Sequence, residues 1–363
     1  MIKLIRDENS THTFLQDYLT EIGVDYNNAE APITLYDISN AGDIKKHHKD
    51  ILPNLSKTVI EKAKTDENFF IVLGNGSEGY NADINFIENF CEQNLIPAHK
   101  IIFLTGNSNI NRYNDSKITV IFMPWFERLT SRNAEYVDIP IDITRPYTWL
   151  SLNRIPRPHR ALHVAYIHKA GIQNKFLWSL NNHAKGKQHI IKSCHKFNDT
   201  LKSIAKELNK IDLPKHLDLL NFDWRQSVNV NLHSLFKQAY FSVVTETSID
   251  KNLCFITEKT FKPIINGHPF IIIGNPGTLD TLRRWGYKTY NNIFNETYDT
   301  ITDENTRLEF INNEILRISN MDSEQIHNMY IQSKDIIQHN QKTFFENKIY
   351  MQDKVFKDTV GIK

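Results

Sequence analysis

Cysteine is scarce in this sequence, and its positions exclude a disulfide framework. The three cysteines, Cys91, Cys194 and Cys254, lie far apart and form no Cys-x-x-Cys pair. An odd and scattered set of this kind is typical neither of a disulfide scaffold nor of a cysteine metal site. We therefore expect a reducing compartment, the cytoplasm of a bacterium or of a virus-infected host cell.

Long apolar runs and an excess of one charge are also missing. No stretch approaches the roughly 18 apolar residues of a membrane helix, and the first residues lack the apolar core of a signal peptide. The 43 lysine and arginine residues balance the 42 aspartate and glutamate residues, so nothing requires a polyanionic partner. At 363 residues the chain is long enough for two domains without a membrane span.

Strands and helices alternate over the first part of the chain. Apolar runs that predict buried strands occur at 33–38, 69–73, 100–104 and 118–123, and helical segments at 51–63 and 83–94. Such repeated strand and helix units predict an α/β fold with a parallel sheet flanked by helices.

A glycine-rich turn follows the strand at 69–73. Its sequence, Gly74-Asn75-Gly76-Ser77-Glu78-Gly79, matches the dinucleotide-binding fingerprint. However, the next strand ends in Leu104-Thr105-Gly106-Asn107, without the acidic residue that would bind the adenosine ribose. Three interpretations stay open: a nicotinamide or flavin site, a plain tight connection, and a loop that presents Glu78 to an acceptor hydroxyl.

The central stretch of the second half runs from Phe241 to Gly274. Continuous apolar runs at 241–244 and 270–273 predict parallel strands that are buried on both faces. Between them a short helix begins after the N-cap Thr257 and ends at a left-handed Gly267.

The start of this helix is suited to an anion. Glu258 and Lys259 occupy its first turn, beside backbone N–H groups that have no partner within the helix. The alternative is that Glu258 only interacts favourably with the helix dipole and that Lys259 is simply solvated. Pro263 is expected to interrupt the helix.

The stretch resembles the donor-site signature of α-1,3-fucosyltransferases and related sugar transferases of the GT-B type. Two elements carry the resemblance, Glu246-Thr247-Ser248 and Phe255-Ile256-Thr257-Glu258-Lys259. It implies that Glu258 binds the ribose of a nucleotide-sugar and Lys259 its diphosphate, with Glu246, Ser248 and Thr257 in the same site. It also implies two Rossmann-like domains facing a cleft, with C-terminal helices that return to the first domain.

The second domain is expected to begin with a strand at 149–152. Arginines follow it in Asn153-Arg154-Ile155-Pro156-Arg157-Pro158-His159-Arg160, where they can bind phosphate oxygens or simply solvate a helix start. In the same families a Ser-Asn pair and a later arginine begin the donor domain. The resemblance therefore implies that Ser151, Asn153 and Arg160 bind the donor. Arg154 is a further candidate because it lies in the same arginine-rich turn.

Two prolines in residues 134–147 indicate the crossing between domains. We expect an acceptor-side domain at 1–144, a donor domain at 145–325, and helices at 326–363 that pack back on the first domain. His159 and His163 have the spacing of metal ligands, but no third ligand lies nearby, so no metal site is expected.

The predicted activity is metal-independent glycosyl transfer from a UDP- or GDP-linked sugar to an acceptor hydroxyl. The chain lacks the Asp-x-Asp motif with which single-domain sugar transferases hold a metal. In an inverting mechanism a carboxylate of the first domain takes the acceptor proton, and Glu78 and then Glu127 are the candidates.

The sequence leaves the acceptor open. The general sequence pattern resembles that of sugar transferases of tailed bacteriophages. This resemblance implies that the acceptor is either a cell-surface glycan or a hydroxymethylated base in modified DNA. Two other classes of function stay open as alternatives: a nicotinamide-dependent dehydrogenase that uses the loop at 74–79, and a non-catalytic nucleic-acid-binding module.

Overall fold

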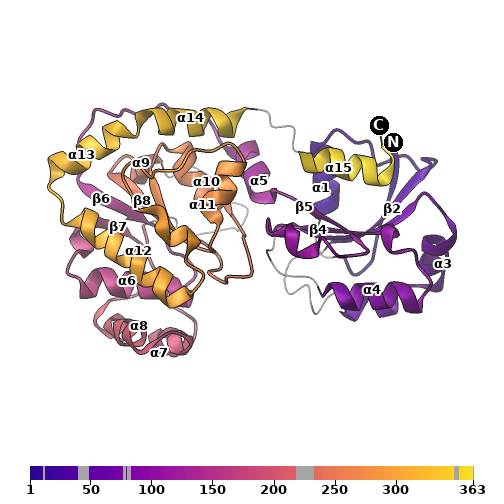
Figure 1. The fold of residues 1–363 in the computed structure, drawn as a ribbon, viewed down its shortest axis with the longest axis horizontal. Helices are drawn as coiled ribbons and strands as arrows, with labels where there is room; N and C mark the ends of the chain where they lie inside the picture. Colours follow the sequence, from indigo (N-terminus) through magenta and orange to yellow (C-terminus); the bar gives the residue numbers. More distant parts are fainter. Residues whose placement is uncertain are drawn as a thin grey trace. The chain divides into compact units, whose positions relative to one another are not determined.

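The protein forms two compact units, each built around one parallel sheet (Figure 1). The computed structural model describes residues 1–10, 13–39, 49–76, 79, 83–217, 233–346 and 351–362. The first unit comprises Met1–Trp125 with Asn347–Lys363, and the second comprises Phe126–Glu346. The predicted α/β class with two helix-flanked parallel sheets is confirmed.

The sheet of the first unit has five parallel strands in the order β1-β2-β3-β4-β5. They are β1 Ile2–Arg6, β2 Ile33–Ser39, β3 Phe69–Asn75, β4 Ile101–Thr105 and β5 Thr119–Phe122. Its helices are α1 Phe14–Glu21, α3 Lys57–Thr65, α4 Ile84–Gln93 and α15 Met351–Val360, with 3-10 turns η1 Leu52–Asn54, η2 Ala98–Lys100 and η3 Ile110–Tyr113. Because spatial and sequence order coincide, the strand order of this sheet never reverses among the described strands.

Both faces of the first sheet are covered. Helices α3 and α4 share an apolar core with one face of β3 and β4, whereas α1 and α15 lie on the opposite side (Figure 1). Tyr18 of α1 donates a hydrogen bond to Asp353 of α15 at 3.0 Å. The ring of Phe356 packs edge-on against Tyr18, and Lys357 Nζ donates to the carbonyl of Ile22. The last helix therefore returns to the first unit, as expected.

The second unit begins earlier in the chain than the proline-containing stretch at 134–147. Helix α5 spans Trp125–Asn133, and the segment after it is tied to the second unit. Gln341 Nε2 donates to the carbonyl of Val137 at 3.1 Å, and Arg145 Nη2 donates to Tyr330 Oη at 2.7 Å. Helices α12 Glu304–Ser319, α13 Ser323–Gln332 and α14 Lys334–Phe345 also belong to the second unit. Of the helices described in the expected segment 326–363, therefore, α15 returns to the first unit and α14 does not.

The sheet of the second unit has four parallel strands in the order β7-β6-β8-β9. They are β6 Tyr147–Ser151, β7 Phe176–Trp178, β8 Ala239–Thr245 and β9 Phe270–Ile273. Strand β6 has β7 on one side and β8 on the other, so the strand order reverses there. In open α/β sheets the carboxyl ends of the strands at such a reversal bound a ligand-binding crevice.

Helices surround this second sheet on both faces (Figure 1). They are α6 Pro158–Lys169, α7 Lys187–Ser193, α8 Asp199–Ala205, α9 His233–Phe236, α10 Glu258–Ile265, α11 Thr278–Arg284, α12 Glu304–Ser319, α13 Ser323–Gln332 and α14 Lys334–Phe345, with 3-10 turns η4 Gln173–Lys175, η5 Cys194–Lys196, η6 Lys206–Lys210 and η8 Glu296–Thr300. Trp149 lies at the centre of the core, stacked between Phe176 and Phe294. Its Nε1 donates to Ser319 Oγ of α12 at 3.0 Å, which satisfies the one polar atom of the indole.

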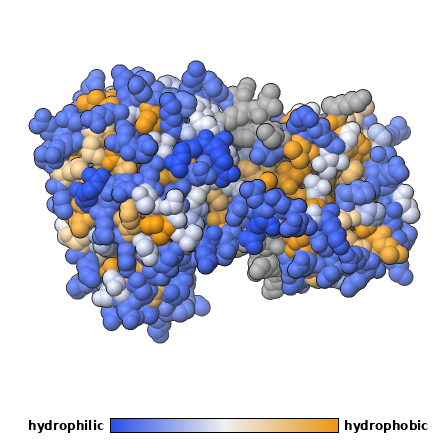
Figure 2. Space-filling view, in the orientation of Figure 1, coloured by the Kyte–Doolittle hydropathy of each residue, from blue (hydrophilic) through white to orange (hydrophobic). Residues whose placement is uncertain are grey.

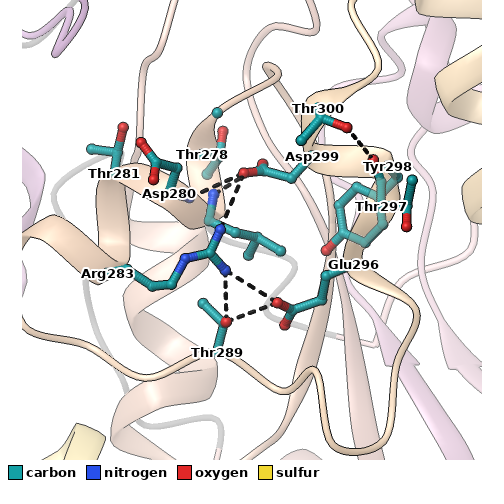
Figure 3. A network of polar contacts seen from close by, with 12 residues as sticks. Thr278, Asp280, Thr281, Arg283, Thr289, Glu296, Thr297, Tyr298, Asp299 and Thr300 are labelled. Atoms are coloured by element: carbon teal, nitrogen blue, oxygen red, sulfur yellow. Dashed lines mark hydrogen bonds and ion pairs between the residues drawn. The ribbon is translucent and has the colours of Figure 1, made fainter.

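Two acidic residues, the buried Asp299 and the partly buried Glu296, fix α11 beside the 3-10 turn η8 (Figure 3). The carboxylate of Asp299 accepts from the backbone N–H groups of Leu279 and Asp280, both at 3.0 Å, and so caps the helix. Arg283 Nη1 lies 3.2 Å from Glu296, and its Nη2 lies 4.0 Å from Asp299. Burial raises the pKa of both carboxyl groups above their ordinary values, and the charge of Arg283 opposes that rise.

Polar and charged residues cover most of the face drawn in Figure 2, with apolar residues in small groups between them. None of the helices in the described residues combines the length and the apolar character needed to cross a bilayer.

Candidate functional site

A pocket of about 260 Å³ opens at the carboxyl ends of β6 and β8, where the strand order reverses. It is lined by Leu150, Leu152, Arg154, Ile155, Arg157, Arg160, Phe236, Ser242, Val243, Val244, Thr245, Thr247, Glu258, Lys259, Lys262 and Pro263. Five of these side chains are cationic and one is a carboxylate. The pocket therefore combines an apolar floor with a strongly positive rim.

Arg160 is the most deeply buried cation of the rim, with 3% of its surface exposed. It lies in the first turn of α6, after the N-cap Arg157 and a proline at the first helical position. Its Nη1 donates to the carbonyl of Ile155 at 3.2 Å, and its Nη2 donates to that of Glu246 at 3.0 Å. Among the described residues, no carboxylate pairs with it, and the Nε atoms of Arg157 and Arg160 are buried without a hydrogen-bond partner.

The electrostatics of Arg160 indicate a site prepared for an anion. Burial and, after it, the neighbouring charge of Arg157 lower the pKa of Arg160 to about 10. The two acidic groups that oppose this shift are Glu246 and Glu258. Since a buried charge without a counter-ion is unfavourable, an anion between these arginines would stabilise the charged guanidinium.

The start of α10 supplies the second group of charged residues. Thr257 is the N-cap as predicted, and its Oγ1 accepts from the backbone N–H of Lys259. Lys259 Nζ donates to Glu258 Oε1 at 2.8 Å and to Thr257 Oγ1 at 3.0 Å. Burial acts to raise the pKa of Glu258, but the charges of Lys259 and Lys262 outweigh it, so the net pKa lies below the ordinary value. Glu258 is therefore ionised and can accept hydrogen bonds from hydroxyl groups.

Glu246 is placed beside the pocket rather than in it. Its buried carboxylate accepts from the Thr257 backbone N–H at 3.0 Å, from Thr257 Oγ1 at 2.6 Å and from Thr260 Oγ1 at 2.7 Å. It also accepts from the backbone N–H of Thr247. These bonds fix the loop between β8 and the start of α10, so Glu246 positions Glu258 and Lys259.

Ser151 and Asn153 have a similar positioning role at the end of β6. Asn153 Nδ2 donates to Ser151 Oγ at 3.0 Å, while its Oδ1 accepts from Thr245 Oγ1 of β8 at 2.6 Å. The backbone N–H of Asn153 donates to Ser179 Oγ, beyond the end of β7. Three neighbouring strand ends are thereby tied together under the pocket.

The remaining predicted residues lie in different places. Arg154 lines the pocket, whereas Ser248 Oγ accepts from the backbone N–H of Asp250 in the loop after β8. Glu127 is buried in α5 of the second unit, not the first, and accepts a hydrogen bond from Tyr287 Oη. Glu78 lies outside the described residues.

The expected interruption of α10 at Pro263 does not occur, because the helix runs through this residue to Ile265. Gly267 then has φ +61°, the left-handed stop that the sequence predicts. Pro263 instead contributes to the pocket wall next to Lys262. The sequence analysis missed Lys262, although a position four residues after Glu258 lies on the same face of a helix.

The glycine turn after β3 has a packing role in the first unit. A Cβ atom at Gly76 would lie 2.1 Å from ring atoms of Phe14, and one at Gly74 would lie 2.3 Å from Ser39 Oγ. Side chains of α1 and β2 therefore pack directly against these two glycines, and a larger residue at either position would force one of them to move. Among its described strands, this sheet has no reversal of strand order where a dinucleotide would bind.

His159 and His163 make contacts with different parts of the second unit. His159 Nε2 is hydrogen-bonded to the carbonyl of Glu246 at 2.8 Å, while His163 packs edge-on against Phe176. Within the described ranges, no group of three or more histidine, cysteine, aspartate or glutamate side chains is arranged to hold a metal ion.

Comparisons with known proteins find neither a matching family model nor a matching curated protein. Among solved structures, the chain is similar to "the DNA modifying enzyme beta-glucosyltransferase in the presence and absence of the substrate uridine diphosphoglucose", with 10% identity over 99% of each chain and a TM-score of 0.42. It is also similar to an alpha1,3-fucosyltransferase, with 11% identity over 97% of this chain and 92% of that one, at a TM-score of 0.43. These values are too low to carry a function from either protein to this chain.

Proposed function

We propose that the protein is a glycosyltransferase that moves a sugar from a UDP- or GDP-linked donor to an acceptor hydroxyl without a metal ion. The observation that supports this most strongly is Arg160, a buried guanidinium that pairs with no carboxylate of the described residues, in a pocket with four further cations. The pocket lies at the reversal of strand order, which is the usual place for a nucleotide in an open α/β sheet.

The chemistry of the pocket matches the parts of a nucleotide-sugar. Its diphosphate would lie between Arg160 and Lys259, which approach the pocket from α6 and α10. The ionised carboxylate of Glu258 would accept hydrogen bonds from the ribose hydroxyls. The apolar floor, which includes Leu150 and Phe236, would cover the base.

The proposed reaction is displacement at the anomeric carbon of the sugar. The bond from that carbon to the diphosphate oxygen breaks, and a bond to the acceptor oxygen forms. Negative charge grows on the departing diphosphate, where Arg160 and Lys259 would stabilise it. Protein cations would thus take the role that a divalent metal has in other sugar transferases.

The acceptor hydroxyl belongs to a glycan or to a hydroxymethylated base in DNA, and a carboxylate would take its proton. Glu78 stays the first candidate for this base. Glu127 is the second, although its place in the second unit and its bond to Tyr287 are those of a packed residue. We place the reaction in the cytoplasm of a bacterium or of an infected host cell.

Calorimetric titration tests the donor site directly. UDP, GDP and CDP are compared with their nucleosides in buffer that contains EDTA. Each charge-assisted hydrogen bond contributes roughly 1.5–3 kcal/mol, so one diphosphate should bind at least about tenfold more tightly than its nucleoside. Donor sugars of the preferred nucleotide are then incubated with glycans and hydroxymethylated DNA, and products are identified by mass spectrometry.

An Arg160→Met variant and a Lys169→Ala variant serve as test and control. Lys169 ends the same helix at its exposed opposite end. We expect the first substitution to weaken diphosphate binding and the second to leave it unchanged, with thermal unfolding used to verify that both variants are folded. Equal affinity for nucleoside and diphosphate in the wild-type protein would refute the proposed donor site.

A further inference from the structure

Ser242 is a pocket residue that the proposed donor contacts do not use. It lies on β8 opposite Leu150 of β6, on the face of the sheet that forms the floor of the pocket. Its Oγ is 3.0 Å from Nδ1 of His268, which is fully buried. The other ring nitrogen of His268 contacts the carbonyl of Phe236. The protonation of this imidazole decides which hydrogen-bonding group Ser242 presents to a ligand.

The surroundings of His268 define its tautomer. Arg145 Nη1 lies 3.2 Å from His268 Nε2, but it donates to the carbonyls of Phe236 and Ala239, both at 2.9 Å. One guanidinium Nη atom carries two hydrogens, so none is left for the imidazole. The carbonyl of Phe236 can only accept, so His268 Nε2 must carry the proton that it donates there.

The neutral imidazole therefore has an unprotonated Nδ1, which accepts the hydroxyl proton of Ser242. Burial and the nearby charge of Arg145 keep the pKa of His268 well below its ordinary value, so the ring stays neutral. With its single proton committed to His268, Ser242 Oγ has only lone pairs left. Any group that binds Ser242 from the pocket must itself donate a hydrogen bond.

We propose that Ser242 selects the nucleobase of the donor by accepting a hydrogen bond from a ring N–H next to a carbonyl, that is, uracil N3–H or the lactam N1–H of guanine; both are called the imide N–H below. This inference rests on the proposed function. Ser242 precedes Thr245 at the strand end by three residues, which is about 10 Å along a β-strand. It thus lies apart from the cationic rim, among the apolar residues Leu150 and Phe236.

The imide donor distinguishes two classes of base. Uracil N3 and guanine N1 carry a hydrogen, whereas cytosine N3 and adenine N1 carry a lone pair that would face the lone pairs of Ser242. A nucleophilic role for Ser242 fits less well, because a neutral histidine with a strongly depressed pKa is a weak base for its hydroxyl. The arrangement is suited to recognition rather than to covalent catalysis.

The test compares UDP and GDP with their imide-methylated analogues, N3-methyl-UDP and N1-methyl-GDP, by calorimetry. We expect methylation of the preferred nucleotide to weaken its binding to the wild-type protein about ten- to a hundredfold. In Ser242→Ala the unmethylated and methylated nucleotides should bind with affinities within about threefold of each other, since the hydrogen-bond acceptor is gone. Ser203→Ala, which changes an exposed serine of α8 outside the pocket, should keep the wild-type ratio of the two affinities.

The outcomes separate this inference from the proposed function. If neither UDP nor GDP binds the wild-type protein, the proposed function fails. If one of them binds and the wild-type protein tolerates methylation of its imide, the inference is wrong and the donor site stands. The inference is also wrong if folded Ser242→Ala distinguishes the unmethylated from the methylated nucleotide as strongly as the wild-type protein does. The wild-type comparison remains decisive even if Ser242→Ala fails to fold.

Discussion

Replacement of Lys259 by alanine is the substitution for which the structure gives the clearest magnitude. The side chain of Lys259 is about a quarter exposed and lines the pocket, and its Nζ contacts Glu258, Thr257 and Thr247. One charge-assisted hydrogen bond to the leaving diphosphate is worth roughly 1.5–3 kcal/mol. At about 1.4 kcal/mol for each factor of ten, Lys259→Ala should lower kcat/KM roughly ten- to 150-fold.

Lys259 has a second effect that must be separated from the first. Its charge contributes to the lowered pKa of Glu258, so its removal alters the carboxylate that would bind the ribose. A double-mutant cycle with Glu258→Gln resolves the two effects. If Lys259 stabilises the leaving group, its loss should lower kcat in the Glu258→Gln background as well.

Steady-state kinetics with the preferred nucleotide-sugar gives kcat and KM for each of the four proteins of the cycle. The loss should appear mainly in kcat, because charge on the diphosphate increases in the transition state. Lys169→Ala is the matched control and should keep wild-type kinetics. Turnover of Lys259→Ala within about threefold of the wild type would refute the assignment.

Three further substitutions test the fold around the site. Gly76→Ala should lower the unfolding free energy of the first unit by about 1–3 kcal/mol through its clash with Phe14, measured by urea unfolding, and should leave UDP affinity unchanged. Glu246→Gln should destabilise the second unit by about 1–3 kcal/mol, because an amide cannot accept all four hydrogen bonds of the carboxylate; an unchanged urea midpoint would contradict this. Arg283→Ala should lower the unfolding free energy by about 1–2 kcal/mol at pH 8 and by less at pH 5. The pKa values of Glu296 and Asp299 are raised, so the two carboxyl groups become ionised as pH rises, and only then do they need the charge of Arg283. A larger loss at pH 5 than at pH 8 would contradict this reasoning.

Local features of the fold were predictable where one residue type determines the conformation. Thr257 caps α10 and Gly267 ends it, because a side-chain acceptor and a left-handed glycine are needed at those positions. Buried parallel strands such as β3 and β8 were found because both faces are covered and their apolar runs are continuous. Strand β1 is only partly buried at the edge of its sheet, so it gives no such signal.

The arrangement of the candidate site was less accessible to sequence reasoning. The hydrogen bonds of Glu246 involve Thr257 and Thr260, and only the folded loop shows that these occupy the carboxylate. The resemblance that suggested a ligand-binding role for Glu246 therefore does not reveal its anchoring role. The reversal of strand order between β7, β6 and β8 also depends on how the strands pair. Ser242 lies within an apolar strand, and its role emerges only with His268 and Arg145 in place.

A crystal structure of the protein with bound UDP or GDP tests the central claim most directly, that the pocket between β6 and β8 receives a nucleoside diphosphate. We predict density for two phosphates within hydrogen-bonding distance of Arg160 and Lys259. Nucleotide density at the glycine turn of residues 74–79, or anywhere else with the pocket empty, would contradict it.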